Sequence, residues 1–131
     1  MSYQIFGSQA ATPIQQVRYQ REDSSTVSFS IKRDDLIDPQ ISGNKWRKLK
    51  YNFSQLKQSK FQGIASFGGA FSNHIAALAA AGHKSNTPTL GFIRTHQIDE
   101  NNPTLALARK RGMTLVPLSR NDYKLRADPD F

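Results

Sequence analysis

Four basic residues stand close together in the chain, at Lys45, Arg47, Lys48 and Lys50. They fall where a helix is expected to begin, and cations at the positive end of a helix dipole each destabilise the helix by about 0.3–1 kcal/mol. No acidic residue between positions 43 and 60 offsets them. Helix N-termini with Lys and Arg nearby bind phosphate groups well, so this segment predicts an anion site, with a solvated basic helix face as the alternative.

Lys45 is the candidate for covalent chemistry within this segment. A lysine that forms a Schiff base must be available as the neutral amine, and the neighbouring cations Arg47 and Lys48 disfavour its ammonium form. The small residues Gly43 and Asn44 before it would let a flat ring approach the backbone closely. Lys45 is therefore a candidate for Schiff-base formation.

A second group of polar residues, Ser72-Asn73-His74, follows the pair Gly68-Gly69. This segment is expected to form a strand, a glycine turn and a helix start, and ligands of open α/β sheets bind beyond the carboxyl ends of strands. Ser72 could donate a proton or act as a nucleophile, and Asn73 could bind a cofactor hydroxyl or a substrate carboxylate. The alternative is that Ser72 is only a helix cap and Asn73 only a loop residue.

The elements expected to position these residues alternate between strands and helices. Residues 26–32 alternate between apolar and polar side chains, which is typical of a half-buried strand with Val27, Phe29 and Ile31 on its apolar side. The later segments are expected to be a helix over 45–58, a strand over 64–67, a helix capped by Ser72 and ending at Gly82, a strand over 89–93, a helix over 103–111 between Asn102 and Gly112, and a strand over 114–116. This order predicts an α/β fold with an open, mostly parallel sheet and flanking helices.

The two ends of the chain carry weaker patterns. Residues 1–25 mix polar and charged side chains, and we expect an irregular arm in which Thr12-Pro13-Ile14 docks on something outside the chain. Residues 119–131 are polar, and no closing element is expected there. The sheet would then have an outer strand without a neighbour.

The composition of the 131 residues limits the possible classes of protein. With 37% hydrophobic and 21% charged residues, the chain is expected to be soluble and globular, with at most one modest core. Without cysteine, and with His74, His83 and His96 too far apart for zinc chelation, no metal centre is expected. The N-terminus lacks the features of a secretory signal and no segment is long enough to span a bilayer, so a cytoplasmic protein is expected.

The formal charge of +8 leaves several kinds of protein open. It suits an enzyme that handles anionic groups, or a piece of a longer protein whose remainder carries the acids. It also suits a basic module that binds nucleic acid, through the cations Lys45, Arg47, Lys48, Lys50, Arg109, Lys110 and Arg111 with Tyr51 or Trp46 stacking on bases. Trp46 and Phe53 are, however, expected in the core. An inactive fragment that assembles through its open sheet edge is a further alternative.

Together these segments resemble the aminocyclopropane-carboxylate deaminase and D-cysteine desulfhydrase family of enzymes, which depend on pyridoxal 5'-phosphate (PLP) and have the tryptophan-synthase-β fold, also called fold type II. The resemblance extends over roughly residues 12–118. It rests on Thr12-Pro13, Ile31 to Leu36, Gly43 to Tyr51, Gly68-Gly69, Ser72-Asn73-His74 and Asn102 to Leu105, in this order.

The resemblance implies a role for each matching residue. Lys45 matches the lysine that binds PLP as a Schiff base and moves the α-proton of the substrate, and Lys48 matches a residue near the cofactor phosphate. Ser72 and Asn73 match a pair that contacts substrate and cofactor, and Ser72 is therefore a second candidate catalytic residue. His74 matches a substrate-binding position that is His in desulfhydrases and Gln in deaminases.

The reaction implied by the family is a β-elimination or a ring-opening deamination of a small amino acid, which releases ammonia and a 2-oxo acid. The complete enzyme is expected to be a homodimer that binds neither nucleic acid nor membrane. Residues 1–45 would be an N-terminal arm and first strand of the larger domain, and residues 46–131 a truncated part of the smaller α/β domain.

The chain also departs from the family pattern. Trp46 stands where a smaller residue is usual, and Phe71 stands where Gln is usual. The glycine-rich loop that holds the cofactor phosphate, and the substrate-selecting residues near the C-terminus, have no counterpart in these 131 residues. We therefore expect the chain alone to bind PLP weakly or nonspecifically and to have little activity.

Overall fold

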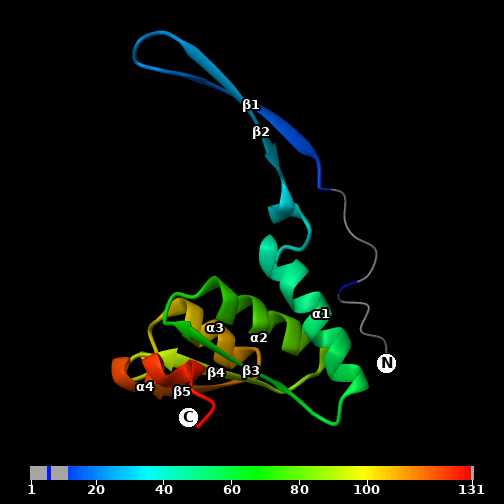
Figure 1. Cartoon of the computed structure of the whole chain (residues 1–131), viewed down its shortest axis with the longest axis vertical. Coiled ribbons are helices and arrows are strands. Elements are labelled where there is room, and N and C mark those ends of the chain that lie inside the picture. Colours follow the sequence, from blue (N-terminus) through cyan, green and yellow to red (C-terminus); the bar gives the residue numbers. More distant parts are fainter. Residues whose placement is uncertain (1–5, 7–11, 131) are drawn as a thin grey trace.

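A three-stranded parallel sheet forms the centre of the molecule. The computed structural model describes Phe6 and residues 12–130. Strands β3 (Ile64–Gly69), β4 (Thr89–Arg94) and β5 (Met113–Leu118) lie in this order, with Ser66 opposite Gly91 and Gly91 opposite Leu115. Helices α2 (Asn73–Ser85) and α3 (Pro103–Lys110) connect the strands and lie on one side of the sheet (Figure 1). The predicted α/β fold with an open parallel sheet and flanking helices is confirmed.

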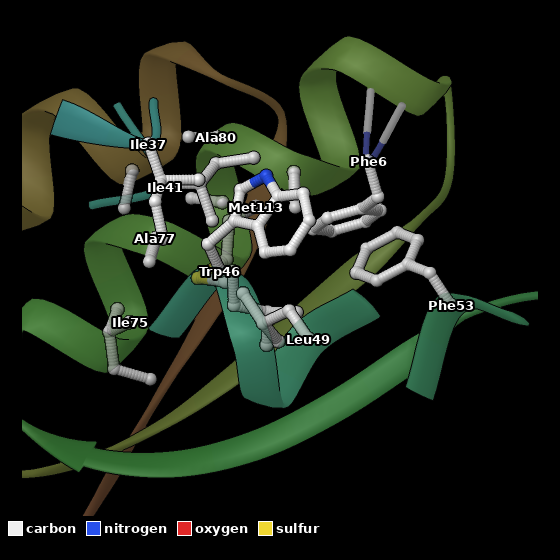
Figure 2. Packing of buried hydrophobic residues seen from close by; sticks show 14 of the residues in the cluster. Phe6, Ile37, Ile41, Trp46, Leu49, Phe53, Ile75, Ala77, Ala80 and Met113 are labelled. Atoms are coloured by element: carbon white, nitrogen blue, oxygen red, sulfur yellow. The ribbon is translucent and has the colours of Figure 1, made fainter. Parts of the chain in front are cut away.

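Helix α1 (Asn44–Gln58) packs beside α2 and adds a third helix to the helical layer. Its side chains Trp46, Leu49 and Phe53 are 4% exposed or less, as expected for Trp46 and Phe53. The ring of Phe6 packs against both aromatic rings, with centroids 5.7 Å from Trp46 and 5.4 Å from Phe53 (Figure 2). The packing of its apolar face therefore sets the position and rotation of α1, which carries Lys45.

Helix α2 is the most buried element in the described part of the chain. Ile75 and Leu78 are fully buried, and the run of alanines from Ala79 to Ala81 lets the helix lie close to the sheet. The helix continues past Gly82, where it was expected to end, and stops at Ser85. Asn86 provides the left-handed residue at the C-terminus, with φ 53°, and Thr87 N–H donates to the Gly82 carbonyl.

An antiparallel hairpin projects away from this body (Figure 1). Strand β1 (Ile14–Gln20) pairs with β2 (Thr26–Lys32), so the expectation of an irregular arm over residues 1–25 is wrong for residues 14–20. In the turn, Arg21 N–H donates to the Ser25 carbonyl and Ser24 N–H donates to the Arg21 carbonyl, and Ser24 adopts a φ of 65°. The remaining residues of that expected arm before position 12 lie outside the described residues, apart from Phe6.

The contacts at the base of the hairpin correct a second expectation. Arg33 N–H donates to the Pro13 carbonyl over 3.0 Å, and Lys32 Nζ donates to Thr12 Oγ1 over 2.7 Å. The partner of Thr12-Pro13 is therefore in this chain. The strand over 26–32 is confirmed, but its apolar side is poorly covered, with Phe29 45% and Ile31 39% exposed. Alternation predicted the strand correctly and its half-buried state incorrectly.

The C-terminal segment is more structured than its polar composition indicates. Helix α4 (Arg120–Lys124) and a short 3-10 helix, η3 (Leu125–Ala127), follow β5, where no closing element was expected. Ser119 caps α4 by accepting a hydrogen bond from Asp122 N–H. Tyr123 then lies against Phe67, with ring centroids 6.1 Å apart, so α4 covers part of the sheet face opposite α2. In the sequence, the cap residue Ser119 and the aromatic residue Tyr123 were the features that indicated this helix and its packing.

Candidate active site

The chain enters α1 through a backbone conformation that suits glycine. Gly43 is the N-cap residue with a φ of 63°, in the left-handed region, and no side chain caps the helix there. Its N–H donates to the Asp34 carbonyl over 3.1 Å, which ties the helix start to the end of the hairpin. Lys45 follows in the first helical turn, and its Nζ donates to Asn44 Oδ1 over 2.8 Å.

Lys45 and Asn73 line one pocket of about 310 Å³, formed where α1 and α2 begin. Two predicted site residues from separate segments of the sequence thus lie together. The other residues that line the pocket are Gln40, Ser42, Asn44, Ala76 and Ala77. They provide amide and hydroxyl groups and no carboxylate, so the pocket suits a polar ligand that carries negative charge.

Arg47 has a different role from the one expected. Its guanidinium donates two hydrogen bonds to the Asp34 carboxylate, over 2.9 Å from Nε and 3.0 Å from Nη2. The same carboxylate pairs with Lys32. Arg47 first and Lys32 second hold the pKa of Asp34 well below its usual range. An acid from outside the helix therefore balances Arg47, whereas Lys48 is exposed.

Ser72 is the N-cap of α2, as predicted. Its Oγ accepts a hydrogen bond from Ile75 N–H over 3.3 Å, and its side chain is half-buried. Gly68 lies directly beneath it, because a Cβ at position 68 would be 2.9 Å from Ser72 Oγ and 2.5 Å from Ile75 Cγ1. Ser72 is not among the residues that line the Lys45 pocket. The turn places its hydroxyl at the carboxyl end of β3.

His74 faces a neighbouring pocket of about 480 Å³ between α1, β3 and α2. Its Nε2 lies 2.8 Å from Ser66 Oγ. Burial lowers the pKa of His74, and the positive charges of Lys45 and Lys48 lower it further. The imidazole is therefore neutral near pH 7 and close enough to both lysines to respond to their charge.

Sequence reasoning missed two groups that shape the site. Ser66 lies inside a short apolar strand, and no feature of the sequence assigned it a partner. Asp34 stands nine positions before Gly43, in an Asp-Asp pair that follows Lys32 and Arg33. An acid pair that ends a strand before such a helix is the signal that could have identified this contact.

No family model matches the chain. A curated relative from Arabidopsis thaliana, described as a mitochondrial bifunctional D-cysteine desulfhydrase/1-aminocyclopropane-1-carboxylate deaminase, is 31% identical to it over 98 residues. The match covers 71% of this chain and 24% of the relative, so the chain corresponds to about a quarter of that enzyme. A continuous match that covers 71% of the 131 residues includes residues 45–73 wherever it begins. The similarity is partial and links the chain to an enzyme.

The described residues contain no helix with both the length and the apolar character that a membrane span requires. Within the same residues, no three His, Asp or Glu side chains are grouped in a way that would hold a metal ion.

Proposed function

We propose that this chain forms the lysine-bearing part of a PLP site in an enzyme that deaminates or desulfhydrates a small amino acid. The observation that carries the proposal is the shared pocket of Lys45 and Asn73, two residues that the family resemblance assigns to the cofactor. The partial similarity to a D-cysteine desulfhydrase/1-aminocyclopropane-1-carboxylate deaminase supports the same class. Substrates of this class would release ammonia and a 2-oxo acid.

The residues around the pocket fit a PLP-like group. A volume of about 310 Å³ falls at the lower end of the range that small-molecule sites occupy. Its lining combines a primary amine with the amides of Asn44 and Asn73 and the hydroxyl of Ser42, all of which can bind an anionic, oxygen-rich ligand. Gly43 presents no side chain at the helix start, and a Cβ there would meet no atom within 4 Å. A flat ring could approach the backbone at this point.

Lys45 would hold the cofactor through its side-chain amine and move a proton at the substrate α-carbon. PLP, when bound, supplies an electron-withdrawing ring that stabilises negative charge at this carbon. Asn73 would orient the ligand by donating from its side-chain amide, and Lys48, one turn after Lys45, would provide positive charge for the phosphate. The positive charges of both lysines also act on His74, whose pKa they lower.

Ser72 and His74 would contribute on the substrate side. The Ser72 hydroxyl lies at the carboxyl end of β3 beside Asn73, where it can donate a proton or a hydrogen bond to a bound amino acid. His74 lines the neighbouring pocket and, as a neutral imidazole, can accept or donate a hydrogen bond. We propose both as substrate-binding residues, with Ser72 also catalytic.

We also propose that residues 1–45 belong to the larger domain of such an enzyme and residues 46–131 to the smaller one. The exposed apolar side chains of the hairpin support this division, since Tyr19 is 59%, Phe29 45% and Ile31 39% exposed. A two-stranded hairpin with one apolar face is marginally stable without a further layer. We further propose that the complete enzyme is a homodimer.

The nucleic-acid alternative is weakened by the contacts of its key residues. Trp46 is 4% exposed and packs against Phe6, so its ring is closed to a base. Arg47 is bound to Asp34 and Arg109 pairs with Glu100, which removes two of the cations expected to contact phosphates. Loss of these groups leaves a smaller basic surface than the sequence indicates.

A PLP titration followed by visible absorbance tests the proposal. We expect weak but saturable binding to the wild-type chain, loss of the saturable component in Lys45→Arg, and weaker binding with the same spectrum in Lys48→Arg. Lys60→Arg, at an exposed position beyond α1, serves as the charge-conserving control and should match the wild type. Equal saturable binding by Lys45→Arg and the wild type would refute the role of Lys45.

A further inference from the structure

Asp34 connects three parts of the chain near the start of α1. Its carboxylate accepts two hydrogen bonds from Arg47, at 2.9 and 3.0 Å, and pairs with Lys32 at the end of β2. Its backbone carbonyl accepts the N–H of Gly43 over 3.1 Å. One residue thus holds the hairpin, the N-cap of α1 and the first turn of α1.

These contacts leave the segment before Lys45 little freedom. The carbonyl of Asp34 fixes Gly43, two residues before Lys45, and its carboxylate fixes Arg47, two residues after it. The two-point contact of Arg47 with the carboxylate also sets the relative orientation of the two groups. Lys45 lies between these two anchored positions.

We infer that Asp34 is a positioning residue for the candidate site, which directs the Lys45 side chain into its pocket by clamping both sides of it. The inference rests on the proposed function, because it assigns Asp34 to the lysine that would hold the cofactor. Asp34 acts through Gly43 and Arg47 and is not itself among the residues that line the pocket.

A contribution to stability alone does not account for this arrangement. Partly exposed ion pairs contribute little to the free energy of unfolding, and the side chains of Arg47 and Asp34 are 37% and 29% exposed. Asp35 offers a comparison within the same turn, since it pairs with Arg33 and its side chain makes no described contact with α1. Asp34 and Asp35 carry the same charge, but the side chain of Asp34 binds a residue of α1 and that of Asp35 does not.

Reductive trapping of PLP tests the inference without requiring enzyme activity. The chain is treated with limiting PLP and borohydride, and peptide mass spectrometry gives the ratio of label on Lys45 to label on the exposed Lys60. We expect Asp34→Asn to lower this ratio several-fold, because small displacements of a reactive group strongly reduce its reactivity. Asp35→Asn removes the same charge from the same turn and should leave the ratio unchanged.

Two further variants separate positioning from folding. Arg47→Gln should lower the ratio as Asp34→Asn does, and the double variant should be no worse than either single variant, because both remove one clamp. Asp34→Glu should restore part of the ratio. Urea unfolding identifies any variant that fails to fold, and if Asp34→Asn does so, Arg47→Gln decides the question.

The outcomes distinguish the two proposals. If the wild-type chain shows no preference for Lys45 over Lys60, the proposed function fails and the inference fails with it. If the wild type prefers Lys45 and both Asp34→Asn and Arg47→Gln match Asp35→Asn, the role of Asp34 is overturned while the proposed function stands.

Discussion

The hairpin and the α/β body are stabilised in different ways, although both have regular secondary structure. In the hairpin, each strand contacts the other along seven register pairs, and apolar side chains such as Phe29 stay substantially exposed. In the body, α2 lies against α1, α3 and two strands, and Leu78 is fully buried. The comparison shows that hydrogen-bonded structure and buried apolar area are separate properties, and that the body holds most of the buried apolar surface.

The candidate site lies at the junction of these two regions. Asn73 belongs to the body, whereas Lys45 lies in the first turn of the helix that follows the hairpin, and Asp34 holds the start of this helix to the hairpin. A site built in this way depends on both regions, so changes in either can be read at Lys45. The following predictions test this division, beginning with the largest expected effect.

Removing a buried side chain should separate the two regions most clearly. Leu78→Ala in α2 should lower the free energy of unfolding by about 2–5 kcal/mol, because it leaves a cavity in the core. Phe29→Ala in the hairpin removes a larger side chain but should lower it by about 1 kcal/mol or less, because that ring is 45% exposed. Urea unfolding followed by circular dichroism measures both. Similar losses in the two variants would mean that the hairpin is packed as well as the body.

The glycine pair at the end of β3 offers a matched test within the body. Gly68→Ala would place a Cβ 2.5 Å from Ile75 Cγ1, and the resulting shifts should lower the free energy of unfolding by about 1–3 kcal/mol. At Gly69 a Cβ would meet no atom within 4 Å, so Gly69→Ala should change it by about 0.5 kcal/mol at most. Thermal or urea unfolding of the two variants checks this. Equal losses of stability in the two variants would mean that β3 and α2 do not approach each other most closely at Gly68.

The smallest effect is expected from the ionisation of His74. Burial, Lys45 and Lys48 lower its pKa in the folded chain, so below its unfolded pKa of about 6.5 the unfolded chain binds a proton more readily. The stability that His74 contributes is therefore present above this pH and is lost as the pH falls. His74→Asn should reduce the fall in the urea midpoint between about pH 7 and pH 5.

His96→Asn, which alters an exposed histidine in the loop after β4, is the control and should keep the fall seen in the wild type. Below about pH 4 both variants should lose further stability, because the lowered pKa of Asp34 makes its protonation unfavourable in the folded chain. A His74→Asn profile that matches the wild type throughout would contradict the position given to this imidazole between α1 and β3.

Most of the body could be predicted from local patterns. The spacing of Trp46, Leu49 and Phe53 predicted α1, and the caps Ser72 and Asn102 marked the starts of α2 and α3, where the structure has them. These signals are local, because a cap bonds to the first turn of its own helix and an apolar stripe needs only the period of the helix. The parallel sheet followed from the alternation of strands and helices, whereas its strand order, β3-β4-β5, was not predicted.

The errors concern features that depend on distant parts of the chain. Strand β1 carries only Val17 and Tyr19 as an alternating apolar pair, and it forms because β2 pairs with it. Gly82 did not end α2, because Asn86, four residues further along the chain, adopts the left-handed conformation at the C-terminus of the helix. The balance of charge around Lys45 was also misjudged, because Asp34 approaches Arg47 only after the chain folds back.

The assignment of Lys45 as the reactive lysine is the central claim, and reductive trapping of the wild-type chain tests it most directly. After reaction with limiting PLP and borohydride, peptide mapping compares the label on every lysine in the chain. The structure and the family resemblance together predict that Lys45 carries more label than any other lysine, even where PLP binds weakly. Label spread over the exposed lysines, with Lys45 no higher than Lys60, would contradict the account.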